Sequence, residues 1–131
     1  LTIAIDFDGT CVTHEFPRVG KDIGAVPVLK KIIEAGHRII LYTMRAKPMK
    51  DGDIDTEKDA IDWFKSNGIP LYGVNNNSGQ GNWTKSKKIH ADLYIDDASL
   101  GAPLKTDESI SQRPYYDWKL AEELLKDRGV I

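Results

Sequence analysis

The sequence predicts an α/β protein with a doubly wound parallel sheet in three layers. Short apolar segments alternate with segments whose apolar residues follow helical spacing, and this alternation is typical of a parallel sheet covered by helices on both faces. The chain of 131 residues has the length of about one domain, and no Pro-, Gly- or Ser-rich linker divides it. We therefore expect residues 1–131 to form a single domain.

The first half of the chain predicts a strand, a helix and a second strand. Residues 1–5 (LTIAI) form an apolar run rich in β-branched side chains that stops at Asp6, as a buried strand does. Residues 26–33 place apolar side chains at helical spacing, and Gly36 follows as a typical helix terminator. Residues 37–42 (HRIILY) then predict the second strand.

The second half continues the same alternation. Thr56, with Asp59 three positions later, predicts the start of another helix, which ends near residues 67–68. A polar, turn-rich stretch at residues 75–82 separates the two strands that follow. The remaining predicted elements are strands at residues 69–74 and 93–95 and a helix at residues 115–127.

The composition limits the partners and the cellular compartment that we expect for the protein. Twenty acidic and 18 basic residues leave a net charge of −2, which disfavours a nonspecific binder of nucleic acid. Cys11, the single cysteine, has no partner for an internal disulfide, which fits a reducing, cytoplasmic setting. No apolar run approaches the ~18 residues of a membrane span, and residues 1–5 lack the basic start of a signal peptide. We expect a cytoplasmic protein without a membrane partner.

Polar side chains follow all four predicted strands. In an open parallel sheet, functional residues gather beyond the carboxyl ends of the strands. Several carboxylates at one point repel each other unless a cation lies among them, and hard oxygen ligands suit Mg²⁺, which also binds phosphate oxygens. The sequence therefore predicts a Mg²⁺-dependent phosphate site. Its candidate residues are Asp6, Asp8, Thr43, Arg45, Asn75, Asp96 and Asp97.

These strand ends match a known pattern. Residues 6–10 (DFDGT), preceded by an apolar strand, resemble the first motif of the haloacid dehalogenase (HAD) superfamily of phosphohydrolases. Residues 39–43 (IILYT) are similar to its second motif, and residues 93–97 (LYIDD) are similar to its fourth. The resemblance covers about the first 100 residues, and it implies a Rossmann-like HAD core for the fold.

The third HAD motif is a lysine shortly before the fourth. We favour Lys88 for this position, and Lys85 and Lys87 are alternatives. We expect one of the three to be buried in the site, and the other two to belong to a solvated basic turn.

The resemblance implies a role for each acid of the first motif. Asp6 would attack phosphorus and form an aspartyl-phosphate intermediate, which divides one difficult displacement into two easier ones. Asp8 would act as general acid toward the leaving oxygen and then as general base on water. Superfamily dehalogenases lack an acid at the position of Asp8, and transport ATPases have Thr there. The resemblance therefore implies a phosphomonoester hydrolase.

The resemblance also implies how metal and phosphate are held. Asp6, the backbone carbonyl of Asp8 and Asp97 would bind Mg²⁺, with Asp96 in a supporting role. The hydroxyl of Thr43 and the ammonium group of Lys88 would bind the phosphoryl oxygens.

The spacing of the motifs leaves no room for a cap domain. Predicted helices and strands nearly fill the intervals between Asp8 and Thr43 and between Thr43 and Lys88. The chain thus resembles a small capless member with only a short flap at residues 11–24. Capless relatives imply a phosphorylated small molecule or macromolecule as substrate, and a homo-oligomer is a possible assembly.

Other residues and functions stay open at this point. Arg45 is near enough to Thr43 to bind a substrate anion, although a salt bridge within a loop explains it equally well, and Asn75 is a second candidate for substrate binding. The three histidines, His14 among them, show no metal-ligand spacing, so we expect surface or packing roles. The alternative functions are a receiver-like phospho-accepting domain, whose acceptor Asp should end the third strand, and a catalytically silent phosphate-binding module.

Overall fold

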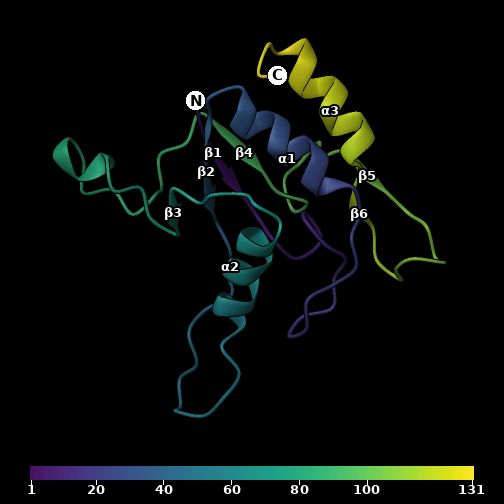
Figure 1. Cartoon of the computed structure of the whole chain (residues 1–131), viewed down its shortest axis with the longest axis horizontal. Coiled ribbons are helices and arrows are strands. Elements are labelled where there is room, and N and C mark those ends of the chain that lie inside the picture. Colours follow the sequence, from purple (N-terminus) through teal and green to yellow (C-terminus); the bar gives the residue numbers. More distant parts are fainter.

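A computed structural model of residues 1–131 contains a four-stranded parallel sheet, three α-helices and a separate two-stranded sheet (Figure 1). The elements in chain order are β1 (Thr2–Ile5), α1 (Ala25–Glu34), β2 (Arg38–Leu41), α2 (Thr56–Ser66), β3 (Gly73–Val74), the 3₁₀ helix η1 (Gln80–Asn82), β4 (Leu93–Ile95), β5 (Leu104–Lys105), β6 (Tyr115–Tyr116) and α3 (Trp118–Asp127).

The main sheet has the strand order β3-β2-β1-β4, and every pair within it is parallel. Ile5, the last residue of β1, lies opposite Leu41 of β2 on one side and Ile95 of β4 on the other. Because the strands are parallel and in register, the segments that follow β1, β2 and β4 leave the sheet at one common edge. The predicted parallel α/β fold is confirmed.

The three helices contribute to one core on one face of the sheet. Successive side chains of a strand point to opposite faces, and Ile3 and Ile5 belong to the same buried cluster as residues from α1, α2 and α3. Ala4 and Ile40, which point the other way, are buried outside that cluster. The connection from β3 to β4 contains no α-helix, only the 3₁₀ helix η1. Ile89 lies in this connection, and its carbonyl accepts a hydrogen bond from the hydroxyl of Tyr94 in β4. The expected three-layer, doubly wound arrangement is therefore not confirmed.

The helix predicted to start at Thr56 is confirmed as α2, and Asp55 caps it, because its side chain accepts a hydrogen bond from the N–H of Lys58 at 2.9 Å. The third strand is shorter than predicted and pairs only at Gly73–Val74. Pro70, within the predicted strand, has no N–H to offer a neighbouring strand.

The last helix also starts later than predicted. Asp117 caps α3, with its side chain accepting from the N–H of Leu120 at 3.1 Å. Tyr115 and Tyr116 instead pair antiparallel with β5. This small hairpin precedes α3, which packs against α1 (Figure 1).

The flap at residues 11–24 lies in the connection between β1 and α1. Val12 forms bridges with Asp8 and Asp22, and the N–H of Thr13 donates to the carbonyl of Lys21 at 3.1 Å. These contacts close the segment on itself and leave no separately folded unit in this connection. None of the helices combines the length and the apolarity that a membrane span requires.

Candidate functional site

Three carboxylates converge where β1 and β4 end. Asp6, Asp96 and Asp97 each offer one oxygen, and these oxygens all lie within 4.8 Å of one another. The N–H of Asp6 donates to the carbonyl of Ile95 at 2.9 Å, which places the residue after β1 directly beside the end of β4. The predicted convergence is confirmed for these three acids, which we call the carboxylate cluster.

Burial and mutual repulsion disfavour negative charge in the carboxylate cluster. Burial raises the pKa of Asp6 to about 8; a hydrogen bond from Thr10 opposes this shift, and repulsion from Asp96 adds to it. Burial likewise raises the pKa of Tyr116 to about 12, and the negative charges of Asp96 and Asp97 add to this shift. Both shifts mark a partly buried region where additional negative charge is unfavourable and positive charge is favourable.

Thr10 connects the members of the carboxylate cluster. Its buried hydroxyl lies 2.8 Å from Oδ2 of Asp6 and 3.2 Å from Oδ1 of Asp97, and it accepts a hydrogen bond from the N–H of Asp97 at 3.0 Å. Trp118 in turn donates its indole N–H to the carbonyl of Thr10 at 2.7 Å. The motif DFDGT contains Thr10, but the sequence indicated no role for it, and it indicated only a core position on a helix for Trp118.

His14 is a second contact that the sequence analysis missed. Its Nε2 lies 2.8 Å from Oδ2 of Asp97, a contact that the expected surface or packing role did not include. The imidazole lies over Gly9, where the backbone has a φ of +82° and an added Cβ would collide with both His14 and Asp97. Glycine at position 9 therefore allows the positive φ of the turn and leaves space for His14 of the flap to contact Asp97.

Asp8 lies apart from the carboxylate cluster and is held by Arg45. The guanidinium donates from Nε to Oδ2 and from Nη2 to Oδ1 of Asp8, both at 2.8 Å. Its remaining donors reach the backbone carbonyls of Pro17, Arg18 and Thr56. Arg45 is only 2% exposed, and none of its N–H groups is left for a substrate. Of the two roles left open for Arg45, the structure has the salt bridge, which is formed with Asp8.

Thr43 and Asn75 join the ends of β2 and β3. The side-chain amide of Asn75 accepts from the N–H of Thr43 at 2.8 Å and donates to its carbonyl at 2.9 Å. Asn75 therefore holds the backbone of Thr43 at this edge of the sheet. Thr43 is half-buried just beyond the end of β2, and its hydroxyl accepts from the N–H of Arg45 at 3.1 Å.

The structure separates the three candidate lysines by location. All three are exposed, so the expectation of one buried lysine was wrong. Lys88 lines a cavity of about 340 Å³ that also includes Asp96 of the carboxylate cluster and Tyr42. Its Nζ lies 5.6 Å from the centre of the Tyr94 ring. The other two line a different cavity, which contains none of the carboxylate cluster: Lys85 and Lys87.

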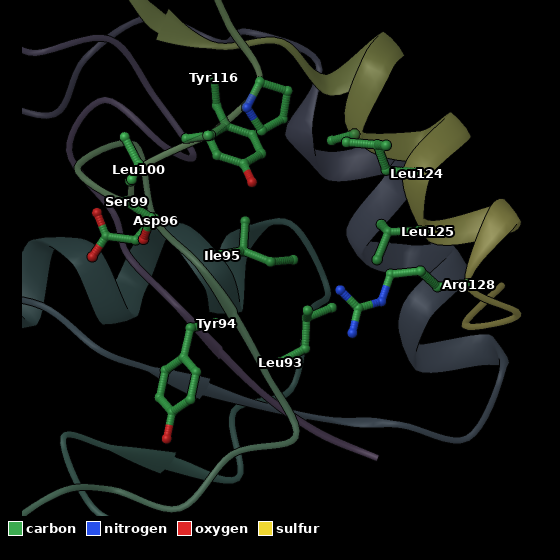
Figure 2. Close-up of a pocket in the computed structure, with 14 residues that line it drawn as sticks. Leu93, Tyr94, Ile95, Asp96, Ser99, Leu100, Tyr116, Leu124, Leu125 and Arg128 are labelled. Atoms are coloured by element: carbon green, nitrogen blue, oxygen red, sulfur yellow. The ribbon is translucent and has the colours of Figure 1, made fainter.

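A further cavity of about 260 Å³ lies between β4 and α3, next to the carboxylate cluster (Figure 2). Its lining is mostly apolar and includes Ile95 of β4 and Leu124 of α3. Figure 2 shows Tyr116 and Arg128 extending toward it from opposite sides, with Asp96 at its margin. The site region thus has an apolar surface on the outer side of β4.

Comparison with solved structures relates the whole chain to another protein. A structure described as a conserved protein coded by a locus from Bacteroides thetaiotaomicron has a TM-score of 0.73 with 33% sequence identity, over 97% of this chain and 90% of that chain. The chain belongs to the same family as this Bacteroides thetaiotaomicron protein. The likeness extends well beyond the motif-bearing first 100 residues. No protein-family model and no curated protein matches the chain.

Proposed function

We propose that the protein is a Mg²⁺-dependent phosphomonoester hydrolase that acts through an aspartyl-phosphate on Asp6. The observation that carries this proposal is the convergence of Asp6, Asp96 and Asp97 within 4.8 Å, with Asp6 opening the DFDGT sequence. The proposed class is a small capless phosphatase of the HAD type, with a HAD-like core. The substrate is a phosphorylated small molecule or macromolecule.

The donor set fits a hard divalent cation. The carboxylate cluster offers only oxygen ligands, and its partial burial favours replacing repulsion among acids with coordination. Asp6, Asp97 and the Asp8 carbonyl would hold Mg²⁺, with Asp96 supporting them. When bound, Mg²⁺ offsets the repulsion between an anionic nucleophile and an anionic phosphate.

Thr10 orients the proposed nucleophile. Because its hydroxyl lies 2.8 Å from Oδ2 of Asp6, it restricts rotation of the carboxylate that attacks phosphorus. The Asp6–phosphorus bond forms as the bond from phosphorus to the leaving oxygen breaks. Asp8 donates a proton to that oxygen and later accepts one from the water that hydrolyses the intermediate.

The phosphoryl oxygens need donors at the same edge of the sheet. Thr43 lies just beyond the end of β2, which pairs with β1, and Lys88 shares a cavity with Asp96. A hydroxyl and an ammonium group at these positions would neutralise charge on the transferred phosphoryl group.

Phosphatase activity of purified protein on a panel of phosphomonoesters tests the proposal. We expect hydrolysis with Mg²⁺ and none with EDTA. Asp6→Asn should abolish turnover, whereas Asp127→Asn, which changes an exposed acid at the end of α3, should leave it intact. Full activity of Asp6→Asn, or no hydrolysis across sugar phosphates, nucleotides, phosphopeptides and phosphorylated oligonucleotides, would contradict the proposal.

A phosphodonor experiment separates the alternative functions. The paired acids follow β4, whereas β3 ends at Val74 and is followed by Asn75, where a receiver domain should have its acceptor Asp. Incubation with a small phosphodonor should give turnover in a phosphatase, stable phosphoprotein in a receiver-like domain, and neither in a silent phosphate-binding module.

A further inference from the structure

Arg45 is a fully engaged cation that lies inside the protein next to the proposed active site. Its side chain is 1% exposed, and the Asp8 carboxylate it pairs with is 18% exposed. Two of its N–H groups bind Asp8, and the other three bind backbone carbonyls at 2.7–3.3 Å. A guanidinium has five N–H groups, so every one has an acceptor within the chain.

These contacts join three segments of the chain. The carbonyls of Pro17 and Arg18 belong to the flap, and the carbonyl of Thr56 belongs to the start of α2. The guanidinium carbon also lies 5.0 Å from the centre of the Phe7 ring and 5.2 Å from that of the Phe16 ring. One side chain therefore links the loop after β1, the flap and the start of α2.

We propose that Arg45 is a positioning residue: it fixes the Asp8 carboxylate for acid and base transfer and ties Asp8 to the flap. The inference rests on the proposed function, because it assigns Asp8 that role. A planar guanidinium that pairs with both oxygens of a carboxylate fixes its orientation as well as its place. A lysine at this position has the charge but cannot reproduce the two parallel hydrogen bonds.

The chemistry says which substrates should reveal this role. As the phosphorus–oxygen bond breaks, the Asp8 proton moves to the leaving oxygen, while the Asp6 carboxylate forms its bond to phosphorus. An alkoxide leaves poorly without that proton, whereas p-nitrophenolate leaves well without it. Misplacing Asp8 should therefore slow the hydrolysis of alkyl phosphates much more than that of p-nitrophenyl phosphate.

The first experiment compares Arg45→Gln and Arg45→Lys with wild-type protein on glycerol phosphate and p-nitrophenyl phosphate, with Mg²⁺. We expect Arg45→Gln to lower kcat for glycerol phosphate about 100-fold, with KM nearly unchanged, and to affect p-nitrophenyl phosphate far less. Arg45→Lys should recover part of the loss. Lys47→Gln, which removes an exposed cation of the same loop, is the matched control and should match wild type.

A double-mutant cycle tests whether Arg45 acts through Asp8. In an Asp8→Asn background, Arg45→Gln should cause little further loss of kcat for glycerol phosphate, because the group that it positions is already gone. Independent, multiplying losses would overturn the proposal. Equal losses on both substrates, or a change confined to KM, would overturn it as well.

The contact with the flap has a readout that needs no activity. Trypsin can cleave after Arg18, whose side chain is 82% exposed, but the carbonyl of this residue is held by Arg45. We expect faster cleavage there in Arg45→Gln but not in Asp8→Asn, measured below the melting temperature of each variant. Unchanged cleavage would overturn the tie to the flap, and Arg45→Lys provides the measurement if Arg45→Gln does not fold.

The outcomes distinguish this inference from the proposed function. If wild-type protein hydrolyses none of the phosphomonoesters of the panel with Mg²⁺, glycerol phosphate and p-nitrophenyl phosphate included, the proposed function fails, and the acid and base role of Asp8 fails with it. If wild-type protein is active and Arg45→Gln loses activity equally on both substrates, the phosphatase stands and the positioning role of Arg45 is wrong.

Discussion

Nε2 of His14 lies 2.8 Å from Oδ2 of Asp97, although 83 positions separate the two residues in the chain. His14 belongs to the flap, and Asp97 belongs to the carboxylate cluster at the end of β4. Partners that hydrogen-bond to metal-binding carboxylates orient them, and their loss commonly weakens binding. The flap thus reaches the proposed metal site through one imidazole.

Replacing His14 should weaken metal binding. We expect His14→Ala to lower the apparent affinity for Mg²⁺ about tenfold, because Asp97 loses a partner that orients its carboxylate. Titration calorimetry with Mg²⁺ measures this. His90→Ala is the control, since His90 is exposed and its ring packs on Trp83. Equal affinities of His14→Ala and wild type would mean that this contact does not support the site.

Gly9→Ala should destabilise the protein more than the same change at Gly36. Both glycines have a positive φ, at 82° and 90°, so both changes incur a backbone cost of about 1–2 kcal/mol. At Gly9 the new Cβ would also collide with His14 and Asp97, whereas at Gly36 it would meet nothing within 4 Å. Urea unfolding of the two variants isolates the cost of the collision, and equal losses of stability would refute the close packing of the flap on Gly9.

The carboxylate cluster could be predicted because its signals are local in the sequence. Apolar runs that stop at Asp6 and at Asp96-Asp97 mark strand ends, and parallel pairing then brings those ends together. The sheet itself followed from the same apolar runs. The sheet and the carboxylate cluster each depend on short stretches of sequence, so the sequence pattern alone predicts them.

The contacts that support the cluster could not be predicted in this way. Trp118 and Thr10 are 108 positions apart, and Arg45 and Asp8 are 37 apart, so their pairing depends on how whole elements pack. The β5–β6 hairpin escaped prediction for a related reason, because strands of two residues have no periodicity to detect. Sequence reasoning therefore found the acids but not the side chains that hold them.

Removing the indole N–H of Trp118 should cost stability. Trp118→Phe leaves the carbonyl of Thr10 without its buried partner, which we expect to lower the free energy of unfolding by about 1–3 kcal/mol. Trp63→Phe is the matched control, because Trp63 packs against Phe7 but donates no hydrogen bond from its indole. Urea unfolding of both variants measures the two losses of stability. A loss at Trp118 no greater than at Trp63 would assign Trp118 to packing alone.

Asp92 should stabilise the fold in a pH-dependent way. The N–H of Thr2 donates to its carboxylate at 2.8 Å, and this bond lowers the pKa of Asp92 below its ordinary value of 3.8. Because the pKa in the folded state is the lower one, the stabilisation is complete well above 3.8 and is lost as the pH falls through the folded value. Unfolding measured against pH should show the gap between wild type and Asp92→Asn closing on acidification. A gap that does not depend on pH would refute this assignment.

The three lysines before β4 give a direct test of how phosphate is bound. Lys88 lines the cavity that contains Asp96, whereas Lys85 and Lys87 line a cavity without any member of the carboxylate cluster. Loss of a group that neutralises charge on the phosphoryl oxygens typically costs 10²–10³ in kcat, so we expect Lys88→Ala to lose about that much. Lys85→Ala and Lys87→Ala remove equally exposed charges from the same segment and should retain wild-type kinetics with Mg²⁺. A comparable loss in all three variants would point to a general effect of positive charge, and a loss confined to Lys85 or Lys87 would move the phosphate-binding role to that lysine.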